Sequence, residues 1–174
     1  MQNPFETLGL PLRFDLESSE IERRYREVQR VVHPDRHVGA ASGARRAALS
    51  GAVSASEAYR TVRDEVSRAE ALLAALGHRA APASANADPE LLMAMMELRE
   101  TLQDARAAHD ARAVEALRLR VAALRDETLA ALRGAFDARK LDDAVALLGR
   151  LRYYRRFLDE VAVFEDEDPQ PSAR

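Results

Sequence analysis

Apolar residues recur every three or four positions along most of this chain, the spacing of amphipathic helices. Strand-like alternation is almost absent, and aromatic residues make up only 5% of the sequence. Glycine, proline and capping residues divide the pattern into helices. We therefore predict an all-α protein with helices at about 3–8, 19–32, 44–65, 67–76, 90–109, 111–133 and 141–163.

The second of these helices has two contrasting faces. Ser19 and Glu22 have the spacing of a capping box at its start. On a helical wheel the apolar face consists of Ile21, Tyr25, Val28 and Val32. Almost opposite lies a basic stripe of Arg23, Arg26 and Arg30. Such a stripe is either an ordinary solvated face or a surface for a partner, and the residues that follow it help to decide between these.

Pro34 cannot continue that helix and disfavours helical geometry at His33. The segment 34–43 therefore reads as an exposed loop that opens with Pro34 and Asp35, directly after His33. A third helix then begins near residue 44 or 45. Its apolar positions are expected to face the second helix, which predicts an antiparallel pair; they include Leu49, Val53, Ala55, Tyr59 and Val62.

The second half of the chain has the pattern of an antiparallel three-helix bundle. A short apolar helix with a capping box at Ser67 and Glu70 ends at Gly77 and is expected to bridge the halves. The loose stretch 80–87 reads as a loop, and Gly134 and the polar turn after it are expected to end the second bundle helix. The inward positions are expected to be Leu91, Met95, Leu98, Leu102, Val114, Leu117, Val121, Leu124, Ala144, Leu148, Leu151 and Leu158.

The first bundle helix also carries large apolar residues on a second side. Leu92, Met93 and Met96 lie there, beside Glu97 and Glu100. One explanation is that this helix is buried on two sides. The other is an exposed patch that binds a partner, for which the flexible thioether of methionine is well suited.

Composition excludes several classes of site. The 174 residues include no cysteine, so disulfides and thiolate metal sites are excluded. His33 and His37 could share a metal ion on a helix, but Pro34 breaks it, and His78 and His109 are solitary, so we predict neither a metal site nor a cofactor. No nucleophile and base are paired in a recognisable motif, which argues against an enzyme.

The chain also lacks the features of nucleic-acid and membrane proteins. Its net charge of −3 and its lack of an aromatic platform argue against nucleic-acid binding through the arginine stripe. The sequence contains no long apolar run, and its first ten residues lack the pattern of a signal peptide. We therefore expect a cytoplasmic protein.

The first half resembles a J-domain, the module by which co-chaperones engage chaperone ATPases of the DnaK type. The matching features are F-x-x-L-G-L-P at 5–11, Tyr25 and H-P-D-R at 33–36. The resemblance implies that this surface contacts an HscA/DnaK-type chaperone and stimulates its ATP hydrolysis. The residues it assigns to chaperone binding are Arg23, Arg26, Arg30, His33, Pro34 and Asp35.

The whole chain to about residue 163 resembles the HscB family, co-chaperones of bacterial iron–sulfur cluster assembly. The matching segments are S-R-A-E-A-L-L at 67–73, L-L-M-A-M-M-E-L-R-E at 91–100 and L-R-Y at 151–153. The resemblance implies a J-domain with bridge helix at 1–76, a bundle at 77–164 and a disordered acidic tail at 165–174. It also implies that the bundle binds an IscU-type scaffold protein through Leu92, Met93, Met96, Glu97, Glu100, Arg152 and Tyr153.

This chain departs from the family pattern at the junction between its halves, where Glu65 and Val66 stand near the place of a common proline. It also lacks the cysteine motif of eukaryotic relatives, which favours a bacterial protein. A J-domain co-chaperone with a different client is the alternative. The methionine patch would serve self-association as readily as a client, so the oligomeric state stays open.

Overall fold

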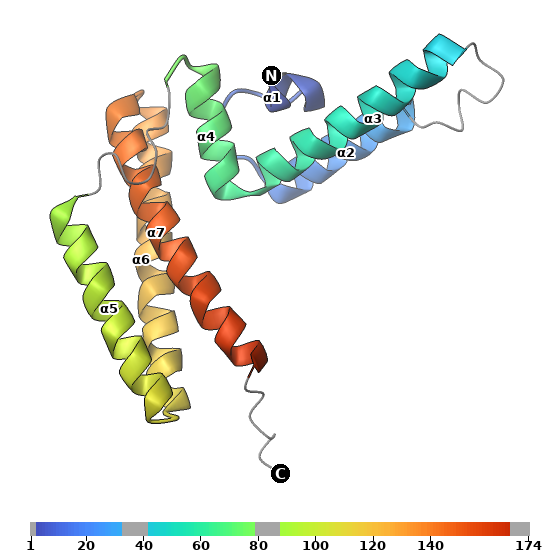
Figure 1. The fold of residues 1–174 in the computed structure, drawn as a ribbon. Coiled ribbons are helices and arrows are strands. Elements are labelled where there is room, and N and C mark those ends of the chain that lie inside the picture. The colour runs from blue at the N-terminus through green and yellow to red at the C-terminus, as the bar shows by residue number, and fades with distance from the viewer. Residues whose placement is uncertain (1–2, 33–41, 79–87, 168–174) are drawn as a thin grey trace. The chain divides into compact units, whose positions relative to one another are not determined.

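The computed structural model describes residues 3–32, 42–78 and 88–167. The chain divides into two compact units, Met1–Ala80 and Ala81–Arg174. In the described residues there are seven helices and no strand (Figure 1), which confirms the all-α prediction. None of the described helices is both long and apolar enough to cross a membrane.

The first unit consists of α1 (Pro4–Leu8), α2 (Ser18–Val32), α3 (Ser42–Arg63) and α4 (Glu65–Ala75). The Asn3 side chain accepts a hydrogen bond from the Phe5 N–H and so caps α1, and Gly9 ends this helix with φ +64°. Phe5 and Leu8 are fully buried, as expected for a helix that docks on its neighbours. The helix α1 contacts both α2 and α3 (Figure 1).

The helices α2 and α3 form the predicted antiparallel pair, but only part of the predicted apolar face of α3 points inward. Leu49 and Val53 were expected to face α2, and they are instead 59% and 51% exposed. Ala55 and Val62 are buried as predicted, and Tyr59 stacks on Tyr25 of α2. The buried positions of α3 are Ala48, Ala55, Ala58 and Val62.

The helix α4 begins earlier than the capping box at Ser67 predicted. Asp64 is its N-cap, and the Asp64 carboxylate accepts hydrogen bonds from both the N–H and the hydroxyl of Ser67. Asp64 therefore has the capping role that the sequence pattern assigned to Ser67. The helix packs within the first unit, where the buried Arg68 donates to the Leu16 carbonyl and lies over the Phe14 ring.

The second unit is a three-helix bundle of α5 (Pro89–Ala107), α6 (Ala111–Asp137) and α7 (Leu141–Glu167) (Figure 1). Asp88 caps α5, and Asp110 caps α6. The prediction that α6 ends at Gly134 is wrong. The buried side chains of Leu132, Ala135 and Phe136 stabilise helix on both sides of this glycine.

The bundle core contains the predicted residues of α5 and α6 together with aromatic residues of α7 that we did not predict. Tyr154 and Phe157 belong to this core beside Leu91, Met95 and Val121. The helix α7 also continues to Glu167, into the predicted acidic tail; the remainder of that tail lies outside the described residues.

Candidate functional site

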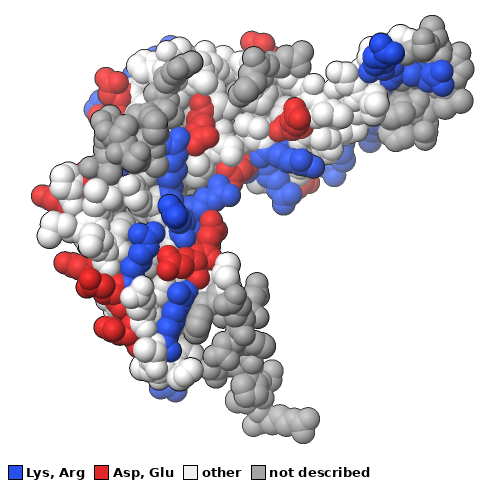
Figure 2. Space-filling model, viewed as in Figure 1, with Lys and Arg blue, Asp and Glu red and all other residues white. Residues whose placement is uncertain are grey.

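The predicted basic stripe lies on the exposed face of α2. Arg23, Arg26 and Arg30 are all exposed, and Figure 2 shows a group of basic side chains over this helix. The opposite face packs on α3, where Ile21 is buried and Tyr25 and Val28 are half-buried. The position of the stripe therefore follows from how α2 packs.

Polar and aromatic contacts hold α2 against α3 just behind the stripe. The Tyr25 hydroxyl lies 3.3 Å from the Ser56 hydroxyl, and the Gln29 amide donates to both of these oxygens. The Tyr25 ring stacks on the Tyr59 ring. These contacts fix the rotation of α2 about its own axis. His33, Pro34 and Asp35, the other predicted chaperone-binding residues, lie outside the described residues.

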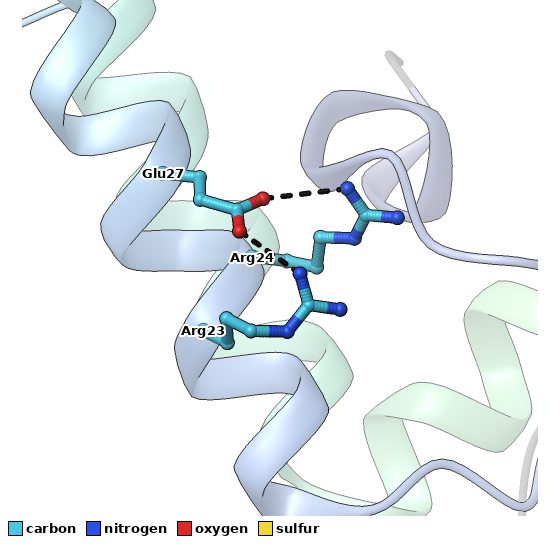
Figure 3. Close-up of polar contacts among 3 residues, drawn as sticks. All are labelled: Arg23, Arg24 and Glu27. Carbon is cyan, nitrogen blue, oxygen red and sulfur yellow. Dashed lines mark hydrogen bonds and ion pairs between the residues drawn. The ribbon is translucent and has the colours of Figure 1, made fainter.

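Acidic side chains interrupt the positive charge of α2. The Glu27 carboxylate contacts two guanidinium groups, with one oxygen 2.9 Å from Arg23 Nη1 and the other 3.3 Å from Arg24 Nη1 (Figure 3). A looser pair joins Arg26 to Glu22 at 4.0 Å. The hydrogen bond from Arg23, followed by the positive charges of Arg23 and Arg24, holds the pKa of Glu27 below its usual value.

The unexpected apolar residues of α5 lie on its exposed side. Met93 and Met96 are 65% and 61% exposed, and Leu92 is 38% exposed. Glu97 and Glu100, on the same side, are exposed as well. We call these five residues the α5 patch. The other side of α5 supplies the bundle core through Leu91, Met95, Leu98, Leu102 and Ala105.

Ion pairs between α5 and α7 show the register of these two helices. Asp88 at the start of α5 lies 2.8 Å from Arg150 Nη2, and Arg99 lies 3.3 Å from Glu160. Arg106 also donates to the Glu160 carbonyl, at 2.7 Å. The two helices therefore run parallel.

This register places the remaining predicted scaffold-binding residues, Arg152 and Tyr153, at the level of residues 90–92 of α5. Tyr153 is half-buried and packs against the bundle core to which α5 contributes. The structure thus brings these α7 residues to the end of the bundle that carries the α5 patch.

Two features of these surfaces were not predicted from the sequence. The pairing of Arg23 with Glu27 has the i, i+4 spacing that favours an ion pair on a helix, so it could have been found. The Asp88–Arg150 pair joins residues 62 positions apart and had no local signal.

Within the described ranges, no group of three or more His, Cys, Asp or Glu residues could hold a metal ion.

Comparison with known proteins gives three findings. Residues 87–162 match the model of a family described as the HSCB C-terminal oligomerisation domain. The co-chaperone protein HscB homolog of Burkholderia multivorans is 38% identical over 161 residues, which cover 90% of each chain. The solved structure of the chaperone HscB from Vibrio cholerae is 33% identical, with a TM-score of 0.84 over 95% of this chain and 99% of that one.

A more distant structure has the same fold. The human co-chaperone protein HscB is 21% identical to this chain, covers 97% of it with 84% of its own length, and has a TM-score of 0.88. At this identity the likeness concerns the fold alone.

Proposed function

This chain belongs to the HscB family of co-chaperones, and on that premise we propose that it is a non-enzymatic adaptor between an iron–sulfur scaffold protein and a chaperone ATPase. The bundle binds an IscU-type scaffold. The J-domain, residues 1–76 with the bridge helix, docks an HscA/DnaK-type chaperone and stimulates its ATP hydrolysis. The cluster on the scaffold is cargo, which is passed on to a recipient protein in the bacterial cytoplasm.

The exposure of the α5 patch is the observation that carries the scaffold-binding half of this proposal. Leu92, Met93 and Met96 lie on the outer side of a helix whose inner side already fills the bundle core. Burying such apolar surface against a partner stabilises a complex by about 25 cal/mol per Å². Glu97 and Glu100 border the apolar residues, which suits a scaffold surface with basic groups at its edge.

The chaperone-binding half rests on the arginines of α2 and on the family motif H-P-D at 33–35. Arginine suits such a surface because its planar guanidinium can bind a carboxylate with two parallel hydrogen bonds. Asp35 makes polar contacts with the chaperone. The hydrolysis itself takes place in the chaperone.

Two binding surfaces on one chain explain how the scaffold reaches the chaperone. Once the J-domain is docked on the chaperone, a scaffold bound to the bundle meets that chaperone within one complex. Its effective concentration there is up to about a millimolar when the linker between two binding modules is short. Delivery of the scaffold is therefore favoured without any new contact between scaffold and chaperone.

Titration of the chain with a purified IscU-type scaffold tests the proposal against its alternative. The proposal expects saturable binding that Met93→Ser and Met96→Ser weaken. A J-domain co-chaperone with a different client expects no binding to this scaffold, although chaperone stimulation would be retained. That second result would contradict the scaffold assignment alone.

A further inference from the structure

Glu27 is an acidic residue at the edge of a surface that the proposed function requires to be basic. It lies on the flank of the arginine stripe, four residues after Arg23 and three after Arg24. Each of its two carboxylate oxygens contacts a different guanidinium group (Figure 3). Glu27 therefore partly neutralises two of the cations of α2.

The charge balance of α2 makes this neutralisation significant. The helix contains four arginines and three glutamates, so its formal net charge is only +1. Glu20 pairs outside the helix, with Arg13 at 3.0 Å, and Glu22 lies 4.0 Å from Arg26. The pair of Glu27 with Arg23, at 2.9 Å, is shorter than the pair of Glu22 with Arg26.

An acidic group that approaches Arg23 has to compete with Glu27. The carboxylate already accepts the Arg23 hydrogen bond, and its negative charge repels a second anion at the same site. The arginine and glutamate side chains are about half exposed, so the pair is weak enough for a partner to displace it. The pair thus lowers the affinity of the surface for an anion without abolishing binding.

We propose that Glu27 restrains chaperone binding by α2, because its carboxylate holds Arg23 and must be displaced when an acidic surface of the chaperone docks. Glu27 therefore sets the affinity and the salt dependence of the complex and limits how long the chaperone is held. This inference rests on the proposed function, since it concerns the same surface.

The test is a titration of chaperone ATPase stimulation at low and at high salt, with the full chain and a purified DnaK-type chaperone. Glu27→Gln should lower the half-maximal concentration about two- to fivefold at low salt, and less at high salt. Glu20→Gln is the matched control, because it removes the same charge from the same helix and its partner lies outside the stripe. It should leave the half-maximal concentration nearly unchanged.

A double-variant comparison separates this effect from a general gain of positive charge. In chains that carry Arg23→Gln, the further substitution Glu27→Gln should lower the half-maximal concentration by a smaller factor than it does in the parent chain. The inference is overturned if Glu27→Gln leaves the half-maximal concentration unchanged or raises it, or if Glu20→Gln lowers it equally. If the parent chain itself fails to stimulate the chaperone, the proposed function fails instead.

Discussion

The ring of Tyr25 on α2 is stacked on the ring of Tyr59 on α3, with centroids 4.3 Å apart and planes inclined by 16°. The same tyrosine reaches Ser56 with its hydroxyl group and accepts a hydrogen bond from Gln29. One side chain thus fixes both the distance between the two helices and the rotation of α2. The orientation of the basic stripe depends on it.

Substitutions at this stack should separate its aromatic and polar parts. Tyr59→Ala should destabilise the α2–α3 pair by about 2 kcal/mol, because both the stacking and the buried ring area are lost. Tyr25→Phe keeps the ring and should cost only about 1 kcal/mol for its hydrogen bonds. Amide hydrogen exchange of α2 and α3 measures both effects; equal costs for the two variants would argue against the ring contact as the main contribution.

Gly51 gives a second prediction about the same helix pair. A Cβ added there would lie 3.1 Å from Val32 Cγ1, so this contact should offset much of the roughly 0.5–1 kcal/mol that replacing a helical glycine by alanine contributes. Gly134→Ala on α6 is the control. A Cβ there meets nothing within 4 Å, and the variant should stabilise its helix by about 0.5–1 kcal/mol. Chemical unfolding should therefore shift to higher denaturant concentration by less in Gly51→Ala than in Gly134→Ala.

The α5 patch should contribute to binding and not to stability. Met93→Ser with Met96→Ser should leave the unfolding transition of the bundle nearly unchanged and weaken scaffold binding at least about tenfold. Leu119→Ser, at a residue of α6 that is 55% exposed, is the control and should leave binding intact. Isothermal titration with the scaffold measures the binding of the patch variant and of the control. Equal losses of affinity in the two would show that any exposed apolar residue contributes alike.

The Glu27–Arg23 pair should be visible in an acid titration. The pKa of Glu27 should lie below the usual 4.5, and Arg23→Gln should move it upward, because Arg23 is the main cause of the shift. The stability that the pair gives to α2 is then complete above about pH 4.5 and is lost as the pH falls through the lowered pKa.

Carbon-13 NMR of the side-chain carboxyl groups measures these values. Glu115 is an internal control, since Arg118 lowers its pKa by an independent hydrogen bond. An unchanged pKa for Glu27 in the Arg23→Gln chain would show that the pair does not persist in solution.

The sequence predicted the class and order of the helices because periodicity and caps are local signals. It also singled out Met93 and Met96 as apolar residues on an unexpected side of their helix. It failed where tertiary packing decides between faces, as for Leu49 and Val53, and where buried neighbours outweigh a helix breaker, as at Gly134. Pairs such as Asp88 and Arg150 have no local pattern, because the bundle alone brings them together.

The central claim is that one chain couples a scaffold to a chaperone through two independent surfaces. The most direct test is chaperone ATPase stimulation, measured with and without the scaffold, for the parent chain, for His33→Gln and for the variant with Met93→Ser, Met96→Ser and Tyr153→Ser. His33→Gln should abolish stimulation, and a direct titration with the scaffold should show that its scaffold affinity is intact. The patch variant should stimulate the chaperone but lose the contribution of the scaffold. Loss of both activities in both variants would contradict the account.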